Sequence, residues 1–410
     1  MRRLAVLLAL FGLLILAGCG AHASSPPGAL APTALLSPTP LPPSATPTVS
    51  PSPTVSPSPT LSPTPTATPS PRRILPPPHG YLYHGVYPGG RTGEEDDLTL
   101  QDLRSYERAA GKAAAWVYFS DNWYRGRSFP RKTAEWIWKA GSVPYIRLML
   151  RSSPEEDVAD PLFTLAAINS GEFDADLRRW CEGARDFGFP LLVEYGTEVN
   201  GSWFPWNGAW NGGGRTDGYG DPKFPDGPER FRDAYRRIIG ICRAVGADNI
   251  TWVFHLNDDD YPAAPWNRFE NYYPGDAWID WIGISVYGAL TPFDEECDDF
   301  QAALDAVYPR VVKMVDADKP IFVAEFGVAA NNPLCNQERW AERALRSLTS
   351  FRWPRIIGFS WWNEYWQNDD DPAHDTTMRL QDNPALAAVF RKFVGANPRV
   401  LGRARFYPER

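Results

Sequence analysis

Histidine and cysteine are scarce in this chain of 410 residues, which has five of each. The sequence contains no H-E-x-x-H motif and no C-x-x-C pair, the spacings with which short segments most often bind zinc. The acidic run Asp258, Asp259 and Asp260 has the ligand type that calcium prefers, but three adjacent acids in a loop more often form a solvated turn. We therefore expect neither a metal site nor a cofactor.

Positive charge is also in deficit. Lysine and arginine number 41 against 49 aspartates and glutamates, so the formal net charge at pH 7 is -8. A protein that binds nucleic acid needs a basic stripe to neutralise phosphates, and no segment of the chain supplies one. Nucleic acid is therefore not an expected partner.

Long hydrophobic runs are missing after the first twenty residues, MRRLAVLLALFGLLILAGCG. Two arginines, an apolar stretch too short for a comfortable membrane span, and small residues directly before Cys19 are typical of a lipoprotein signal peptide. We expect residues 1–18 to be removed and Cys19 to carry a lipid that anchors the protein to the membrane at the cell surface. The alternative is an ordinary secretory signal, and either route takes the protein out of the cytoplasm.

Residues 19–78 consist of the lipidated cysteine and a segment made almost entirely of proline, serine and threonine. Such a composition cannot bury a core and favours extended polyproline II. At about 3.1 Å per residue, the segment could hold a domain up to roughly 170 Å from its lipid. We interpret it as a disordered spacer.

The remaining residues, 79–410, have an ordinary globular composition without a second linker, and we expect one monomeric domain. Short apolar segments predict strands at 81–87, 113–120, 143–150, 189–196, 250–257, 278–288, 320–327 and 356–363. Apolar residues at three-and-four spacing predict helices between strands at 173–188, 228–246, 298–315 and 337–348. Eight strand and helix units predict a (β/α)8 barrel. An open sheet would be expected to carry a glycine-rich phosphate-binding turn after its first strand, and the segment YPGGRTGEEDD does not match that pattern.

Two of the predicted strands run into a glutamate. Glu198 follows the fourth strand and Glu325 ends the seventh. A carboxylate in an apolar strand end is costly unless it is paired, hydrogen-bonded or protonated, and the carboxyl ends of barrel strands are where chemistry gathers. Either glutamate alone is best explained as an ion-pair partner, whereas two that face each other across the mouth predict the acid pair of a glycoside hydrolase.

Tryptophans cluster in the loops that follow the predicted strands. A single loop tryptophan can simply cover the barrel rim, but a set on one face predicts a cleft in which sugar rings pack on indoles. The set comprises Trp203, Trp206, Trp210, Trp266 and Trp366. By contrast, Trp252, Trp278 and Trp281 lie in or beside strands and are expected to pack in the core. His255 ends the fifth strand, where it could contact a substrate hydroxyl or be a satisfied rim histidine.

The segments TEVNGSWFPWNG, YYPGDAWIDWIGISVYG, KPIFVAEFG and FSWWNE resemble glycoside hydrolase family 26 over roughly residues 80–395. This resemblance implies a secreted (β/α)8 enzyme that acts with retention on a β-linked polysaccharide. Most members of that family are endo-β-1,4-mannanases, and β-1,3-1,4-glucanases and xylanases also occur. We therefore expect β-1,4-mannan as the substrate.

The resemblance also implies roles for individual residues. Glu198 matches the acid/base, and Glu325 matches the nucleophile. Tyr287 matches the tyrosine that hydrogen-bonds the nucleophile, and Asn200 matches the asparagine of the E-x-N-G motif. Trp362, with its neighbour Trp361, matches the aromatic floor of the cleavage subsite. Trp203 and Trp206 match loop aromatics near the acid/base, and we include His255 as a substrate-binding candidate.

Two positions depart from the family pattern. Thr197 precedes the acid/base where mannanases usually have histidine, and Glu194 stands where arginine is common. The threonine weakens the mannan assignment more than the hydrolase assignment, which leaves a β-1,3-1,4-glucanase or a xylanase as alternatives. It is also the best support for a rival of another class, a carbohydrate-binding surface protein without turnover. Because Glu194 shares strand parity with Glu198, we expect it to point into the barrel and to pair with Arg147.

Four cysteines follow Cys19, an even number in an oxidising compartment. Cys297 and Cys335 follow two predicted strands, where a bridge between loops is plausible. Cys181 and Cys242 lie in helical patterns and could equally be small buried hydrophobes.

Overall fold

The computed structural model describes residues 73–90 and 95–407. The predicted signal peptide, Cys19 and nearly all of the predicted spacer lie outside the described residues. The first strand, β1 (Ile74–Leu75), already pairs with the last one, β13 (Arg405–Phe406), so the folded part begins before residue 79, where the sequence placed its start.

Eight parallel strands form a closed barrel, as the sequence predicts, because the last strand of the series pairs with the first. Their bounds are β2 (Leu82–Tyr87), β3 (Trp116–Asn122), β4 (Val143–Met149), β5 (Leu191–Tyr195), β6 (Ile250–Asn257), β7 (Trp281–Tyr287), β8 (Ile321–Gly327) and β9 (Ile356–Trp362). All eight overlap the predicted segments. A short strand, β12 (Val400–Leu401), runs parallel to the start of β2, where Val400 aligns with Leu82.

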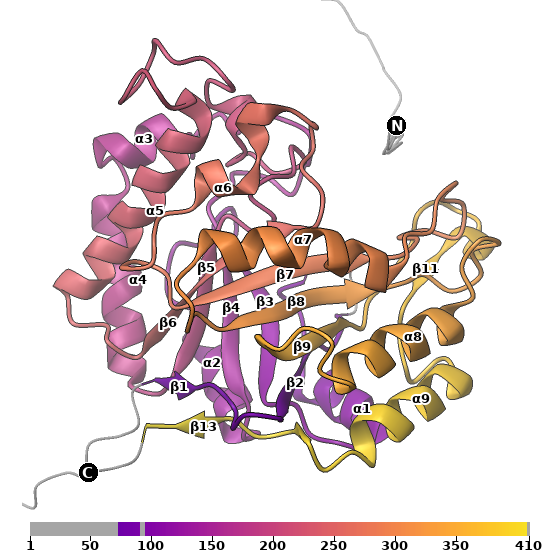
Figure 1. The fold of residues 1–410 in the computed structure, drawn as a ribbon. Coiled ribbons are helices and arrows are strands. Elements are labelled where there is room, and N and C mark those ends of the chain that lie inside the picture. The colour runs from indigo at the N-terminus through magenta and orange to yellow at the C-terminus, as the bar shows by residue number, and fades with distance from the viewer. Residues whose placement is uncertain (1–72, 91–94, 408–410) are drawn as a thin grey trace, which may run out of the picture. The chain divides into compact units, whose positions relative to one another are not determined.

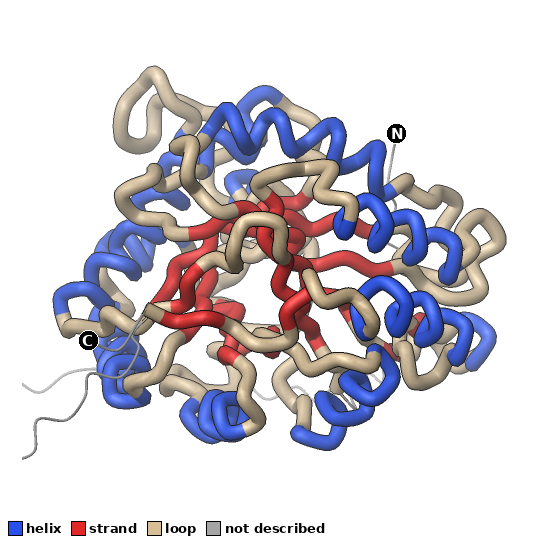
Figure 2. The backbone as a smooth tube through the Cα atoms, turned by 60° about the horizontal axis from the view of Figure 1, so that its bottom comes forward, coloured by secondary structure: helices blue, strands red, loops and turns tan. Residues whose placement is uncertain are grey.

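Helices surround the barrel, and Figure 2 shows the strands at the centre with helices around them. Their bounds are α1 (Leu100–Ala110), α2 (Arg131–Lys139), α3 (Leu165–Ser170), α4 (Asp174–Phe187), α5 (Asp226–Ala244), α6 (Phe269–Tyr272), α7 (Phe300–Met314), α8 (Gln337–Thr349) and α9 (Pro384–Phe390). The four predicted helices correspond to α4, α5, α7 and α8. The apolar faces of the helices pack against the outer face of the strands, while the barrel interior covers their inner face. Both faces of the strands are therefore buried, which explains why their sequences are continuous apolar runs.

Aromatic side chains fill the barrel interior. The indole of Trp116 lies 5.5 Å from the ring of Phe322, and the ring of Tyr145 lies 5.8 Å from that of Phe322. Trp116 also donates a hydrogen bond from Nε1 to Ser360 Oγ at 2.7 Å. A Cβ atom on Gly85 would stand 2.0 Å from that same indole nitrogen, so glycine is required there. The interior below the mouth is therefore packed, and only the mouth remains for chemistry.

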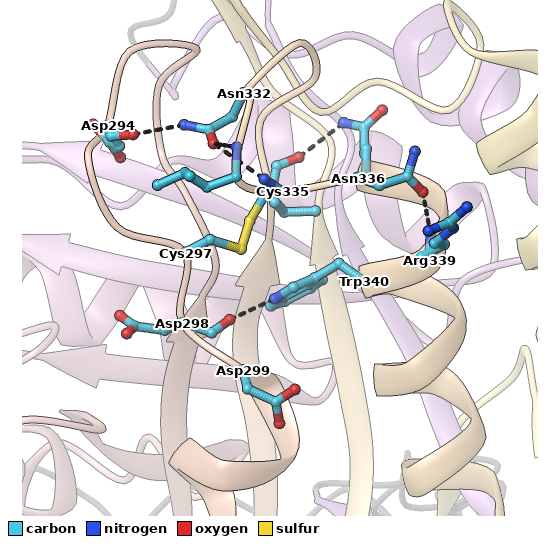
Figure 3. Close-up of a disulfide and its surroundings, with 12 residues drawn as sticks. Asp294, Cys297, Asp298, Asp299, Asn332, Cys335, Asn336, Arg339 and Trp340 are labelled. Carbon is cyan, nitrogen blue, oxygen red and sulfur yellow. Dashed lines mark hydrogen bonds between the residues drawn. A yellow bond between two sulfur atoms is a disulfide. The ribbon is translucent and has the colours of Figure 1, made fainter.

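Two disulfides join segments of the described chain. Cys181 in α4 pairs with Cys242 in α5, where the sequence had left buried thiols as an equal alternative. The second bridge, Cys297–Cys335, was expected, and it joins the loops that follow β7 and β8 (Figure 3). Beside it, Asn332 accepts a hydrogen bond from the Cys335 amide at 3.1 Å and donates one to the Asp294 carbonyl at 2.9 Å. The two loops next to the predicted nucleophile are thus held together.

We expect removal of the first disulfide, in the variant Cys181→Ala with Cys242→Ala, to lower the free energy of unfolding by about 4 kcal/mol. The bridge closes a loop of 61 residues, which the unfolded chain would otherwise explore freely. Urea denaturation measures the change. The variant Cys297→Ala with Cys335→Ala is the matched control. Because its bridge closes a shorter loop of 38 residues, its loss in the free energy of unfolding should be about 0.4 kcal/mol smaller than that of the first variant. A loss below about 1 kcal/mol in both variants would contradict the prediction.

None of the helices in residues 73–90 and 95–407 is both long and apolar enough to cross a membrane. The same residues contain no group of three or more histidine, cysteine, aspartate or glutamate side chains arranged to hold a metal ion. Asp260, from the acidic run that might have suggested calcium, instead forms an ion pair with Arg310 at 2.8 Å.

Candidate active site

Glu198 lies just beyond the carboxyl end of β5, in a backbone conformation that side chains rarely adopt. Its φ is 48°, in the left-handed region. A residue other than glycine is strained there by about 1 kcal/mol or more, and such strain gathers at functional sites. The turn lifts the side chain out of the strand, and Glu198 is half-buried while its neighbours Thr197 and Val199 are buried. The local backbone therefore presents this carboxyl at the barrel mouth.

The loop after β5 holds the Glu198 carboxylate in place. Trp203 donates a hydrogen bond from Nε1 to Glu198 Oε2 at 2.8 Å. The indole in turn stacks on the ring of Tyr261 at 6.1 Å, and Tyr261 is 37% exposed. The predicted acid/base thus has an aromatic wall beside it, built from the loops that follow β5 and β6.

Glu325 lies near the end of β8 and is buried. Tyr287, the last residue of β7, donates its hydroxyl proton to Glu325 Oε2 at 2.8 Å, as the family resemblance implies. The hydroxyl of Tyr118 from β3 lies 2.9 Å from the other oxygen, Oε1. Arg147 from β4 approaches the same oxygen at 3.9 Å. Side chains from β3, β4 and β7 therefore converge on this carboxyl.

Burial raises the pKa of Glu325 to about 7, while the positive charges of Arg147 and His255 oppose the shift. The charge of Glu198 also raises the pKa of Glu325, so the two carboxyls interact electrostatically across the mouth. The sequence predicted an ionised Glu325, and this state prevails above about pH 7. Two carboxyls in one site, with the charge of one acting on the other, are the arrangement expected of a glycosidase pair.

Trp362 ends β9 and contacts side chains that surround Glu325. Its indole packs at 4.1 Å on the ring of Tyr87, and the guanidinium of Arg147 lies 5.4 Å from its centroid. Tyr118 meets it edge-on at 5.9 Å. These contacts place Trp362 among the side chains around Glu325, where the floor of the cleavage subsite was predicted.

Glu194 points into the barrel, as strand parity predicts, and is fully buried. The expected partner Arg147 approaches it at 3.8 Å, but His255 Nδ1 lies closer, at 3.1 Å from both carboxylate oxygens. Arg147 makes its shortest contact instead with Glu95, at 2.5 Å. Although burial raises the pKa of Glu194, the charge and hydrogen bond of His255 lower it to about 2. The buried carboxylate is therefore ionised and paired mainly with His255.

Four residues predicted to bind substrate are almost completely buried, and each makes hydrogen bonds within the protein. They are Asn200, Trp206, His255 and Trp361. Asn200 accepts a hydrogen bond from the Asn257 amide at 2.8 Å and donates to the carbonyls of Asn257 and Asp259, so it joins the loop after β5 to the end of β6 and the loop that follows it. Trp206 donates to the Thr197 carbonyl at 2.8 Å, underneath the Glu198 turn.

Trp361 and His255 both lie away from the mouth, in different surroundings. Trp361 donates to the Met378 carbonyl at 2.8 Å and packs on Phe390 of α9 at 5.1 Å, so it faces the helices. Neighbouring strand residues point to opposite faces, and Trp362 alone of the pair turns toward the site. His255 lies between Glu194 and the Ser285 hydroxyl, 2.8 Å away, below the mouth instead of at its rim.

Three residues around the site were missed by the sequence analysis. Tyr118 contacts Glu325, Tyr261 stacks on Trp203, and Glu95 pairs with Arg147. Tyr118 carried a usable signal, since a tyrosine in an apolar strand needs a partner for its hydroxyl. The other loop tryptophans vary: Trp210 is 37% exposed, whereas Trp266 and Trp366 are half-buried. Trp252 and Trp281 are buried as predicted, and Trp278 is partly buried against the core.

Comparison with protein families agrees with this geometry. Residues 109–345, more than half of the chain, match the model of glycosyl hydrolase family 26. The chain belongs to glycosyl hydrolase family 26. The matched range contains both predicted catalytic glutamates and Tyr287, whereas Trp362 lies beyond its end. The resemblance inferred from the sequence motifs is thereby confirmed.

A curated family relative is Endoglucanase H of Acetivibrio thermocellus, which is 26% identical over 297 residues. The match covers 72% of this chain and 29% of that protein. The chain thus corresponds to less than a third of its relative's length.

Solved structures show the same fold at low identity. A family 26 β-mannanase from Bacteroides ovatus has a TM-score of 0.52 at 16% identity, with 78% of this chain and 90% of that chain covered. A Cellulomonas fimi endo-β-1,4-mannanase double mutant has a TM-score of 0.54 at 19% identity, with 79% and 72% covered. These similarities support the barrel, and at such identities they support the fold alone.

Proposed function

We propose that this family 26 glycosidase is a retaining, endo-acting hydrolase of a β-linked polysaccharide. The observation that carries the proposal is the convergence of Glu198 and Glu325 at the barrel mouth, where the charge of one raises the pKa of the other. Each also has its own positioning partner, Trp203 for Glu198 and Tyr287 for Glu325. A purely structural role explains neither the strained turn at Glu198 nor the burial of Glu325.

In this mechanism, Glu325 attacks the anomeric carbon and forms a glycosyl ester, while Glu198 donates a proton to the departing glycosidic oxygen. Water then enters, Glu198 takes one of its protons, and the remaining hydroxide displaces Glu325 from the sugar. Tyr287 keeps Oε2 of the nucleophile oriented, and the Trp362 indole packs beside the sugar ring. Two inversions at one carbon give net retention.

Retention is tested by following the first product with proton NMR. The β-anomer should appear first and then mutarotate, and an α-anomer as the initial product would contradict the proposal. Retention also requires the two carboxyl groups to stand about 5 to 5.5 Å apart instead of the wider inverting gap.

For the substrate, we propose β-1,4-mannan, the substrate that the family resemblance implies and that the similar structures from Bacteroides ovatus and Cellulomonas fimi are named for. Reducing-sugar release from mannan, mixed-linkage glucan and xylan, each at equal mass concentration, tests the assignment. Mannan should give the highest kcat/KM, and viscosity should fall faster than reducing ends appear, because internal bonds are cut.

A β-1,3-1,4-glucan is the second candidate, and a specific observation favours it. Thr197 stands where family mannanases usually carry histidine, and its hydroxyl is already used: it accepts from Arg147 Nε at 3.1 Å and donates to Glu194. It therefore offers no free donor to the axial 2-hydroxyl that distinguishes mannose from glucose. The relative from Acetivibrio thermocellus is named an endoglucanase. Higher kcat/KM on the glucan than on mannan would select this candidate.

The rival is a carbohydrate-binding surface protein without turnover. Tight binding to one of these polysaccharides, measured by calorimetry, together with no sugar release by the unaltered protein would favour it. The presence of both acids in one site argues for turnover.

We also propose that the protein is attached to the membrane surface through a lipid on Cys19. The support is the signal-peptide pattern that ends directly before this cysteine. In a host that processes lipoproteins, the parent should incorporate labelled palmitate and partition into detergent, whereas Cys19→Ala should do neither. Release of the unaltered protein into the medium without label would refute the anchor.

We expect kcat/KM to fall as pH decreases below about 7. The pKa of Glu325 is raised to about 7 by its burial, and only the ionised form attacks, so activity is lost as pH decreases through that value. A profile from pH 4 to 9 measures this acid limb. Arg147→Met should move the limb to higher pH, because the arginine charge lowers the pKa of Glu325. A limb below pH 5 in the parent would contradict the assignment.

A further inference from the structure

Below the two proposed catalytic acids lies a buried cluster that retention does not require. It is centred on Glu194, whose carboxylate is surrounded by proton donors from four segments. They are Tyr118 of β3, Tyr145 of β4, Thr197 after β5 and His255 of β6. All of these side chains are almost completely buried. A carboxylate has about four acceptor positions, so this one is saturated.

Tyr118 is the member of this cluster that also reaches the nucleophile. Its hydroxyl lies 2.5 Å from Glu194 Oε1 and 2.9 Å from Glu325 Oε1. A tyrosine hydroxyl has one proton, so it can donate to only one of these oxygens at a time. The Nδ1 atom of His255, 3.3 Å away, is not a competing acceptor, because its own proton points at Glu194.

Glu194 can release the Tyr118 proton without losing its solvation. It keeps the hydrogen bonds from Thr197, Tyr145 and His255 when Tyr118 turns away. Glu325, by contrast, has the Tyr287 hydroxyl and the Tyr118 hydroxyl as its only hydrogen-bond donors within 3 Å among the described residues. Its carboxylate therefore depends on Tyr118 much more than Glu194 does.

The charge of Glu325 changes during the reaction. It is an anion before attack and a neutral ester afterwards, so a donor aimed permanently at it would lose its best acceptor in the intermediate. A buried hydroxyl without a hydrogen-bond acceptor destabilises the protein. A second anion within reach of the same hydroxyl removes that cost, because the O–H bond can rotate from one oxygen to the other without any proton transfer.

We propose that Tyr118 is a two-position donor that stabilises Glu325 while it is ionised and turns to Glu194 when Glu325 becomes esterified. Glu194, held ionised by His255, is the standing acceptor. This assignment rests on the proposed retaining function, and both residues are positioning residues, since they act through Glu325 and not on the sugar. No covalent bond other than those of the retaining mechanism forms or breaks.

The titratable and charged groups that face Glu325 come from several strands, so any pH effect must be separated among them. They are Tyr118, Arg147, Glu194, Glu198, His255 and Tyr287. The chain offers a matched control within this set. Tyr145 stacks on Tyr118 at 4.1 Å, is equally buried and donates to the same Glu194 carboxylate, but no hydrogen bond joins it to Glu325.

The experiment compares Tyr118→Phe with Tyr145→Phe in the full chain. Loss of a hydrogen bond to a charged group lowers the ionised fraction of Glu325 at pH 7 by about 10- to 100-fold, and we expect kcat of Tyr118→Phe at that pH to fall by a similar factor, with KM within about twofold. Its acid limb should also move to higher pH, because the ionised form of Glu325 loses a donor. Tyr145→Phe should keep the parental limb and a kcat within about threefold. Equal losses in the two variants, or an unmoved limb in Tyr118→Phe, would overturn the proposal.

A double-mutant cycle tests the link to Glu194. Glu194→Gln should lower kcat with little change in KM, and adding Tyr118→Phe should lower it no further, because both changes disable one device. Multiplicative losses would contradict this. If Tyr118→Phe lacks a cooperative unfolding transition, Glu194→Gln alone carries the test, and an unchanged kcat in it would reject the role.

One readout does not require activity. Carbon-13 NMR of carboxyl-labelled glutamate reports the Glu325 titration, which should move to higher pH in Tyr118→Phe and stay in place in Tyr145→Phe. If the parent hydrolyses no polysaccharide, the proposed function fails. The titration then still decides whether Tyr118 stabilises the Glu325 anion, and an unmoved Glu325 titration in Tyr118→Phe would reject this.

Discussion

Replacing Glu325 by alanine is expected to lower kcat on the preferred polysaccharide by about 10⁴- to 10⁶-fold, because the variant has no group to attack the anomeric carbon. Reducing-sugar release measures the loss. KM should change much less than kcat, since Glu325 is buried and offers little surface to hold the polymer. A cavity the size of one carboxymethyl group remains in the variant.

That cavity allows a chemical rescue. Azide can enter it and attack the anomeric carbon of an activated glycoside, and a single displacement should give the α-glycosyl azide. The matched control is Glu135→Ala, which removes an exposed glutamate of α2 that pairs with the surface cations Arg131 and Lys139, and it should retain parental activity. Hydrolysis at a parental rate by Glu325→Ala would eliminate this residue as the nucleophile.

Replacing Glu198 by alanine should lower kcat on polysaccharide by about 10²- to 10⁴-fold, the usual contribution of a general acid and base. A substrate whose leaving group needs no proton, such as a dinitrophenyl glycoside, should form the ester intermediate at nearly the parental rate and then stall. Stopped-flow absorbance should therefore show a burst of about one nitrophenolate per enzyme.

Azide again distinguishes the two acids. In Glu198→Ala it should attack the accumulated ester without base catalysis and release the β-glycosyl azide, the opposite anomer from that expected for the nucleophile variant. Trp203→Phe removes the hydrogen bond to Glu198 while keeping an aromatic wall, and it should cost much less than Glu198→Ala. The same azide anomer from both acid variants would show that the two roles are not divided as proposed.

The sequence predicted the barrel well because each strand carries its own signal. Segments such as VPYIRLML and PIFVAEFG are apolar on both faces and separated by amphipathic helices, and these patterns depend only on local chain order. Glu198 and Glu325 stood out for a related reason: a carboxylate at the end of an apolar strand is expensive, so it attracts attention wherever it occurs.

Contacts between strands were harder to predict. The pairing of Glu194 mainly with His255, instead of Arg147, depends on distances across the barrel that strand parity does not give. Parity does distinguish Trp361 from Trp362, but deciding which of the two faces inward requires the register of the whole strand. Asn200 shows another limit, since a motif asparagine can bind substrate or join two loops, and only its surroundings distinguish these roles.

The small strands near the start of β2 mark where the polypeptide enters the barrel. β1 and β13 meet around Tyr83, whose hydroxyl donates to the Leu75 carbonyl and accepts from the Arg405 amide, each at 2.9 Å. The polypeptide therefore enters the barrel at its base, at the end opposite Glu198 and Glu325. Entry at the base leaves the mouth clear on the opposite side, so a long polymer chain can approach Glu198 and Glu325 without meeting the strands through which the polypeptide enters.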